Sequence, residues 1–260
     1  MKYIAIVAGG DSSEYEVSLR SAEGVYSFID GDRYHRYIVT LRNSDWKVNM
    51  PDGTIYDVDK NDFSFRINEN KIHFDYAYIT IHGRPGEDGR FQGYLDMLNI
   101  PYSSCGVLAG ALTFNKYIHT QFLKSLGFRV ADSIRLLEGQ HINAEEIINR
   151  LGLPVFVKPN DGGSSFGITK VKEASQMNSA IEKAFSEGRE VIIERFIEGT
   201  EITCGCYKTK TRQIALPITE VVTNNEFFDY DAKYNGQVEE ITPARISEEL
   251  TDRVQRQTLE

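Results

Sequence analysis

The sequence predicts an α/β protein that opens with a parallel sheet and continues into a part of α+β character. Over the first part of the 260 residues, apolar strand-like runs alternate with amphipathic helical patterns, which is typical of a parallel sheet covered on both faces. A glycine-rich segment between two β-branched runs at 155–171 predicts an antiparallel hairpin. The length also favours several packed units, since a single core rarely keeps growing beyond this size.

The first element expected is a strand at 3–8. Ser13 and Glu16 then have the spacing of a capping box, which predicts the start of a helix. The apolar stripe expected on that helix consists of Val17, Ala22, Val25 and Phe28. The chain therefore opens with a strand, a turn and a helix.

Short alternating runs between Trp46 and Phe74 predict hairpins inserted into the first sheet, because turn-forming segments interrupt them. Residues 76–81 form another buried strand, which ends at the polar loop 82–89. Open α/β sheets bind their ligands beyond the carboxyl ends of their strands. The loop 82–89 is therefore the first candidate site.

The second part of the chain begins near Gly106, with one helix expected to run through Phe122. A strand at 155–159 then leads through the glycine loop 160–167 into a strand at 168–171. Neither a Walker loop nor a dinucleotide fingerprint is present, because no suitably spaced glycines open a helix. The other elements expected here are helices at 144–151 and 179–186 and a strand at 190–197.

The last part of the chain contains a strand-like run at 201–207 that places Cys204 and Cys206 on one face. We interpret them as small buried thiols, because no second pair of Cys or His residues stands nearby to complete a zinc site. Ser247 is expected to cap a final amphipathic helix. Because the chain ends inside that helical pattern, we expect its last domain to be incomplete.

Composition restricts the possible partners. The formal net charge of −9 argues against nucleic-acid binding, which depends on clustered Lys and Arg residues that neutralise phosphates. No stretch approaches the roughly eighteen apolar residues that a membrane-spanning helix needs. The first residues lack the cleavage pattern of a signal peptide. We therefore expect a cytoplasmic protein with a small-molecule substrate and no contact with nucleic acid or membrane.

The glycine loop and its surroundings have the chemistry of a nucleotide site. Backbone amides of a glycine-rich hairpin close over phosphate oxygens, because glycine has no Cβ in the way. Lys116 and Lys158 supply the positive charge that a triphosphate requires. The strand after the loop and the residues beyond it offer groups for the adenine and the ribose: Glu194, Phe196, Ile197 and Glu201.

Four segments resemble, in the right order, motifs of the ATP-grasp superfamily and within it of the D-alanine:D-alanine ligase family. Residues 9–18 and 82–89 are similar to its two substrate loops, 158–167 to its lid, and 228–234 to a mobile loop that closes over the active site. The resemblance implies a Rossmann-like N-terminal parallel sheet followed by a split, incomplete ATP-grasp fold. The domains it implies are a substrate domain with inserted hairpins at 1–104, a central lid domain at 105–197 and an incomplete C-terminal domain at 198–260.

The resemblance also assigns roles to residues by their positions in these motifs. The residues implied to act in catalysis are Glu14, Ser164 and Tyr234. Those implied to bind the substrate are Val17, Ser18, His82 and Lys233. Those implied to bind the nucleotide are Lys116, Lys158, Glu194, Phe196, Ile197, Glu201 and Phe227. Those implied to form the lid loop are Gly162, Gly163, Ser165 and Gly167.

Two of these residues also have plainer explanations when each is taken alone. Glu14 suits the positive end of a helix dipole, and His82 suits a strand end where its hydrogen bonds are satisfied. Together, the motifs favour the functional interpretation. In it, Glu14 anchors the ammonium group of a first D-alanine and His82 lies beside that substrate.

The implied reaction joins two D-alanine molecules through an acylphosphate, with ATP and Mg²⁺, in peptidoglycan precursor synthesis. The family's magnesium ligands and an Arg are expected in a segment beyond Glu260, so no metal ligand is expected in this chain. We therefore expect these 260 residues not to turn over alone. A homodimer is also implied. Two alternatives stay open: a D-alanine:D-lactate-type ligase, against which Tyr234 argues, and an ATP-binding regulatory module or pseudoenzyme.

Overall fold

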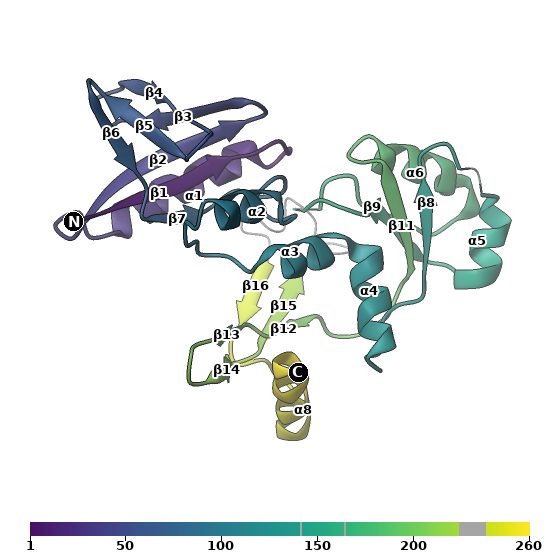
Figure 1. Cartoon of the computed structure of the whole chain (residues 1–260). Coiled ribbons are helices and arrows are strands. Elements are labelled where there is room, and N and C mark those ends of the chain that lie inside the picture. The colour runs from purple at the N-terminus through teal and green to yellow at the C-terminus, as the bar shows by residue number, and fades with distance from the viewer. Residues whose placement is uncertain (141, 164, 224–237) are drawn as a thin grey trace. The chain divides into compact units, whose positions relative to one another are not determined.

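A computed structural model of the chain describes residues 1–140, 142–163, 165–223 and 238–260 (Figure 1). These residues form two compact units, Met1–Arg195 and Phe196–Glu260. Within the described part of the chain, every helix is too short or too polar to cross a membrane. The expected division into three domains stays a prediction.

The first unit contains the predicted parallel sheet, in the order β4-β3-β2-β1-β7. Strand β1 pairs in parallel with β2 on one side and with β7 on the other, so that Val7 lies between Val39 and Ile79. Strands β3 and β4, which extend the sheet beyond β2, are antiparallel additions. The bounds are β1 Lys2–Gly9, β2 Tyr34–Arg42, β3 Asp45–Asn49, β4 Ile55–Asp57 and β7 Tyr76–Ile79.

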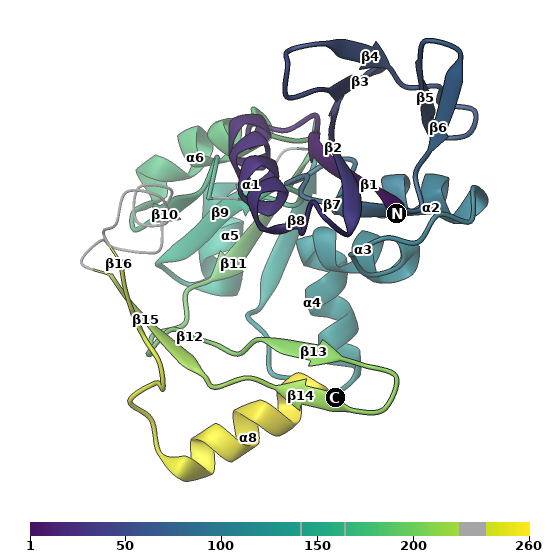
Figure 2. The ribbon, with the colours of Figure 1, turned by 90° about the vertical axis from the view of Figure 1, so that its left-hand side faces the viewer.

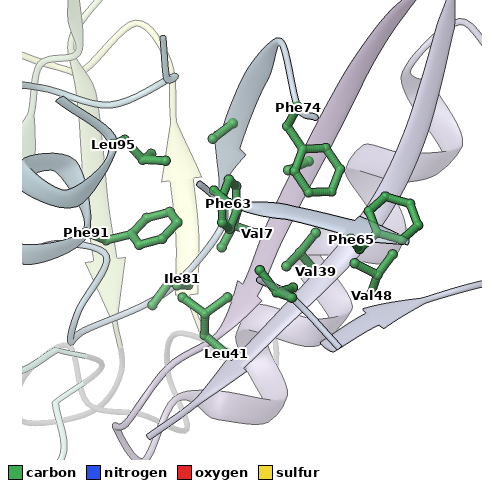
Figure 3. Close-up of a cluster of buried hydrophobic side chains, with 13 residues drawn as sticks. Val7, Val39, Leu41, Val48, Phe63, Phe65, Phe74, Ile81, Phe91 and Leu95 are labelled. Carbon is green, nitrogen blue, oxygen red and sulfur yellow. The ribbon is translucent and has the colours of Figure 1, made fainter. Parts of the chain in front are cut away.

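Alternation along β1 explains why both faces of this sheet are covered. Ile4, Ile6 and Ala8 belong to the cluster that packs against helix α1 (Tyr15–Phe28). Ala5 and Val7 point to the opposite face, into a second cluster. That cluster includes residues of α2 (Arg90–Met97) and of the hairpin β5 (Ser64–Ile67) and β6 (Asn70–His73) (Figure 3). The hairpins expected between Trp46 and Phe74 are therefore present.

The start of α1 differs from the prediction. The N-cap is Glu14 and makes no side-chain capping bond, so the capping box of Ser13 and Glu16 is wrong. The loop is instead held by a tertiary contact, because Ser12 Oγ donates to the His82 carbonyl at 2.8 Å. The prediction of an apolar stripe on α1 is also wrong at the C-terminal end of the helix, where Phe28 is 91% exposed, although Val17 and Ala22 are buried.

The single helix expected from Gly106 to Phe122 is two helices, α3 (Val107–Phe114) and α4 (Lys116–Ser125). Asn115 separates them in an extended conformation, and its side chain accepts a hydrogen bond from the Ile118 N–H at 2.9 Å. Asn favours such capping positions, and this preference overrides the continuous apolar pattern. As a result, Lys116 becomes the first residue of a helix.

The glycine loop belongs to an antiparallel sheet with the order β10-β9-β11-β8. Helices α5 and α6 cover one face of this sheet (Figures 1 and 2). The predicted strand–loop–strand hairpin and both flanking helices are confirmed. The bounds are β8 Ser133–Leu137, α5 Ala144–Leu151, β9 Val155–Pro159, β10 Thr169–Val171, η1 Ala174–Gln176, α6 Met177–Phe185 and β11 Glu190–Arg195.

The second unit contains a three-stranded sheet, a separate hairpin and a final helix. The continuous strand expected at 201–207 is broken in two at Cys204 and Gly205, and Cys206 is exposed, so the buried-thiol interpretation is wrong for Cys206. Ser247 caps the last helix as predicted, accepting from the Leu250 N–H at 3.3 Å. The bounds are β12 Ile202–Thr203, β13 Cys206–Lys208, β14 Gln213–Ala215, β15 Thr219–Thr223, β16 Val238–Ile241 and α8 Glu248–Leu259.

Candidate functional site

Two loops meet beyond the carboxyl ends of β1 and β7. The Asp11 N–H donates to the Arg84 carbonyl at 2.8 Å, next to Gly10, whose φ is 98°. A Cβ at Gly10 would lie 2.7 Å from that same carbonyl, so the loops approach this closely only because residue 10 has no side chain. The first and second predicted substrate loops are thus neighbours, as expected at this edge of a parallel sheet.

Glu14 and His82 lie together in this region. The Glu14 side chain is buried, and its Oε1 lies 3.9 Å from Nδ1 of His82. The other ring nitrogen of His82 lies 3.4 Å from Oγ of Ser21 on α1. A buried carboxylate beside an imidazole at the end of a sheet is suited to hold a small cationic group.

Val17 and Ser18 follow Glu14 on the first turns of α1, and both are buried. The Ser18 hydroxyl accepts from the Gly9 N–H and donates to the Thr80 carbonyl, each at 2.8 Å. It therefore ties the carboxyl ends of β1 and β7 together. This contact positions the two loops, while the substrate contact assigned to both residues stays a prediction.

Lys158 and Glu194 form an ion pair on the second sheet. Val155 and Val157 on β9 point into the core beneath α5 and α6, so period-two geometry places Lys158 on the opposite face. Glu194 on β11 is displayed on that same face by the same alternation, since Ile193 is in the core. The sheet thus presents a lysine and a glutamate on the side that its helices leave uncovered.

Lys116, at the start of α4, donates a hydrogen bond from Nζ to the Gly162 carbonyl at 2.6 Å. Burial, and then the neighbouring charge of Lys158, lower the pKa of Lys116 to about 8. Three carboxylates oppose this shift: Glu194, Glu14 and Glu87. Within the first unit, the structure therefore brings together both predicted phosphate-binding lysines, the carboxylate of the substrate loop and the lid.

The glycine loop between β9 and β10 contacts the first substrate loop directly. A Cβ at Gly163 would lie 2.8 Å from Oε2 of Glu14, so the carboxylate lies against the loop backbone. Beside this contact is a pocket of about 500 Å³. Its lining residues are Gly86, Glu87, Gln92, Ser104, Cys105, Thr113, Phe114, Lys116, Gly162 and Gly163.

Two contacts at the base of the lid were missed by reasoning from the sequence. Arg84 in the second substrate loop forms an ion pair with Asp161. Asn160 is completely buried and joins the end of β9 to the start of α4, because its Oδ1 accepts from the Tyr117 N–H at 2.8 Å. Neither contact has a local sequence pattern, since the partners are far apart in the chain.

The other predicted site residues fall into three groups. Ser165 and Gly167 are in the lid loop, with positive φ values of 61° and 69°. Residues that fall outside the described part of the chain are Ser164, Phe227, Lys233 and Tyr234. Residues that belong to the second unit are Phe196, Ile197 and Glu201, of which Ile197 and Glu201 are exposed.

Magnesium has no evident ligand set in the residues that the structure describes. Nowhere among them do three His, Cys, Asp or Glu side chains gather in a way that could hold a metal ion. None of the described side chains is therefore assigned to Mg²⁺.

A parallel sheet with two adjoining loops, followed by an antiparallel sheet that carries a lysine, a glutamate and a glycine lid, defines an enzyme of ATP-grasp fold. The family described as D-ala D-ala ligase matches the chain with its N-terminal part over residues 3–105 and its C-terminal part over residues 122–260. The chain belongs to the D-alanine–D-alanine ligase family and is an enzyme of the ligase class.

Curated relatives support this assignment. A D-alanine–D-alanine ligase of Parabacteroides distasonis is 64% identical over 257 residues, which cover 99% of this chain and 78% of the relative. A D-alanine–D-alanine ligase of Bacteroides fragilis is 62% identical, with coverage of 98% and 79%.

Solved structures similar to this chain support the same family assignment. D-alanyl-alanine synthetase A of Vibrio cholerae has a TM-score of 0.84 at 26% identity and covers 99% of this chain and 79% of its own. The VanG D-Ala:D-Ser ligase of Enterococcus faecalis has a TM-score of 0.79 at 30% identity, with coverage of 99% and 80%. A Bacillus anthracis D-alanine–D-alanine ligase complexed with ATP has a TM-score of 0.74 at 29% identity, with coverage of 100% and 76%.

Proposed function

We propose that this chain carries the substrate and nucleotide sites of a ligase that forms D-alanyl-D-alanine from two D-alanine molecules at the expense of ATP. The observation that carries the proposal is that two anchors of opposite charge meet on one loop. Lys116 Nζ bonds to the Gly162 carbonyl at 2.6 Å, and the Glu14 carboxylate lies against Gly163. A triphosphate held by the lysine and an ammonium group held by the glutamate would approach each other beneath the lid.

In the proposed reaction, the carboxylate of the first D-alanine attacks the γ-phosphorus of ATP, giving D-alanyl phosphate and ADP. The amine of the second D-alanine then attacks the acyl carbon, loses a proton and displaces phosphate. Glu14 holds the first ammonium group, while Lys116 and Lys158 neutralise the phosphates, since positioning and charge supply most of the catalysis in phosphoryl transfer. The lid excludes water that would hydrolyse the acylphosphate.

The remaining assignments are part of the same proposal and rest on the family resemblance. Val17, Ser18, His82 and Lys233 belong to the substrate site, and Ser164 and Tyr234 act with Glu14. Glu194, Phe196, Ile197, Glu201 and Phe227 belong to the nucleotide site. Magnesium as the metal of the reaction, a homodimer, a cytoplasmic location and a role in peptidoglycan precursor synthesis complete it.

A second candidate acceptor is favoured by one observation. The chain is similar at 30% identity to a structure named as a D-Ala:D-Ser ligase, so the same fold can accompany another acceptor. Ligation of D-alanine to D-serine or D-lactate is therefore the alternative, and Tyr234, which favours an amine acceptor, lies outside the described residues.

The experiment is a coupled assay of ADP release with ATP, Mg²⁺ and D-alanine, in which the product is identified by mass spectrometry against D-serine and D-lactate competitors. The chain is compared with a version extended at its C-terminus by the segment in which the family resemblance places the magnesium ligands. We expect D-alanyl-D-alanine from the extended version, and its loss in the Lys158→Ala variant of that version. ATP binding without ligation by either protein would favour the regulatory alternative.

A further inference from the structure

Asn160 is the first residue after β9 and has no exposed surface, and all of its polar groups are hydrogen-bonded. Its backbone N–H donates to the Glu190 carbonyl at 2.9 Å, which continues the pairing of β9 with β11. Its carbonyl and its side-chain oxygen both face the start of α4 instead. Asn160 is thus hydrogen-bonded both to β11 and to the start of α4.

The first N–H groups of a helix have no partner within the helix and need one from outside. In α4, the Lys116 N–H donates to the Asn160 carbonyl at 3.0 Å and the Tyr117 N–H to Asn160 Oδ1 at 2.8 Å. The local cap, Asn115, supplies only the next bond, to Ile118. Asn160 therefore caps α4 from a position 43 residues away in the sequence.

The orientation of the Asn160 amide is determined by its other end. Nδ2 donates to Oε2 of Glu190 at 2.7 Å, and a carboxylate accepts but does not donate, so Oδ1 must face Tyr117. Arg135 Nη1 lies 3.7 Å from the same Glu190 oxygen, and the guanidinium lies over the Tyr117 ring at 5.2 Å. The Asn160 amide is thus held by Glu190 at its nitrogen and by the Tyr117 N–H at its oxygen.

We propose that Asn160 is a positioning residue of the nucleotide site: by capping α4 from the lid strand, it sets the place of the Lys116 ammonium group against the lid. Lys116 is joined to this segment twice, by its backbone to Asn160 and by Nζ to the Gly162 carbonyl. The proposal rests on the proposed function only in giving Lys116 a phosphate to bind. The capping geometry is independent of it.

The first test does not need ATP. The reactivity of the Lys116 amine is followed against pH by trace acetylation and mass spectrometry. The charged groups that face this amine are Lys158 from β9, Glu194 from β11, Glu14 before α1 and Glu87 after β7. In Asn160→Ala we expect the pH midpoint of Lys116 labelling to rise by about one pH unit, because a loosened start of α4 admits water to the amine.

The control is Ile193→Val, which removes a buried methylene from the same sheet but leaves the contacts of α4 intact. It is expected to keep the Lys116 midpoint of the wild type. A midpoint in Asn160→Ala equal to that of the control would overturn the proposal.

The second test is rescue by exchange. Asn160→Asp alone places two carboxylates together, whereas Asn160→Asp with Glu190→Gln keeps the hydrogen bond with donor and acceptor reversed, and keeps an oxygen for Tyr117. We expect the ATP dissociation constant to rise about ten-fold in Asn160→Ala and to return to within about three-fold of the wild-type value in the exchanged pair.

A folded exchanged pair that does not recover the wild-type affinity would overturn the proposal. This pair also tests the proposal if Asn160→Ala does not fold. A wild-type chain that binds no ATP would contradict the proposed function, while the labelling result would still decide the role of Asn160.

Discussion

The Glu14 carboxylate lies directly against the backbone of Gly163, so that a Cβ at residue 163 would come within 2.8 Å of Oε2. Glu14 precedes α1 and Gly163 is in the lid, so this contact joins two motifs separated by most of the first unit. Because of this contact, a movement of the lid backbone at Gly163 would displace the carboxylate of the first substrate loop.

Gly163→Ala is therefore expected to displace the Glu14 carboxylate and weaken D-alanine binding roughly ten-fold, the scale of one charge-assisted hydrogen bond. Because the atom to be moved is the end of a side chain, the free energy of unfolding should change by less than about 1 kcal/mol. Calorimetric titration with D-alanine checks the first effect and urea unfolding the second. Gly24→Ala, where a Cβ meets nothing within 4 Å, is the control, and unchanged affinity in Gly163→Ala would contradict the contact.

Lys116 should couple ATP binding to proton uptake. Its pKa in the free protein is lowered to about 8 by burial and by Lys158, and a bound triphosphate would raise it again by direct charge interaction. Proton uptake on binding should therefore rise from about half a proton at pH 8 towards one proton near pH 9, and the affinity should fall as the pH rises above 8. Calorimetry in buffers of different ionisation enthalpy measures this uptake. Lys116→Arg, which stays protonated, should show none.

The same shift predicts a pH dependence of stability. The folded pKa of Lys116 lies below the ordinary value of 10.5, so the unfolded chain binds more protons between about pH 8 and 10.5. The unfavourable contribution of Lys116 is thus complete below pH 8 and is relieved as the pH rises to 10.5. Lys116→Met should stabilise the protein at pH 7, by an amount that vanishes towards pH 10.5. Urea unfolding of both proteins across this range would reveal a constant difference if the lysine were unshifted.

The ion pair of Lys158 and Glu194 should appear as an energetic coupling. Both side chains are mostly buried, with 22% and 13% of their surfaces exposed, so removing one partner leaves an uncompensated charge. In a double-mutant cycle of Lys158→Ala and Glu194→Ala, we expect a coupling of roughly 1–2 kcal/mol in the free energy of unfolding. The pair of Lys47 and Asp57, whose aspartate is 85% exposed, is the control and should show less. Equal coupling in the two cycles would contradict the importance of burial.

Periodicity predicted much of this molecule because the relevant information is local. Alternating β-branched residues define β9 and β10, and the same alternation places Lys158 opposite the helix-covered face. The carboxyl ends of parallel strands lie at one edge of a sheet, so the loops after β1 and β7 were expected at that edge, although the strand order was not predicted. The family motifs then indicated which of the polar residues to examine.

The error at Ser13 and the missed cap of α4 came from contacts between distant parts of the chain. Ser13 has the spacing of a capping residue, but the bond of Ser12 to the His82 carbonyl shapes the loop differently. The capping of α4 by Asn160 was missed for the same reason, since the cap and the helix are 43 residues apart. Local patterns describe the groups that need partners, whereas tertiary packing decides which distant groups supply them.

Two phenylalanines give the last prediction, because Phe63 is buried in a core whereas Phe28, expected on an apolar stripe, is exposed. Phe63 has no exposed surface and contacts the rings of Trp46, Phe74 and Phe91 in the cluster shown in part in Figure 3. Phe28, expected on the apolar stripe of α1, is 91% exposed. Phe63→Ala should lower the free energy of unfolding by about 3–5 kcal/mol, since it removes buried area and leaves a cavity, whereas Phe28→Ala should change it by less than about 0.5 kcal/mol. Urea unfolding of both variants checks this, with the slope against urea confirming that the cooperative unit is unchanged. A large loss in Phe28→Ala would mean that this face of α1 is covered in solution, and a small loss in Phe63→Ala would mean that the inserted hairpin does not contribute to the core of the first unit.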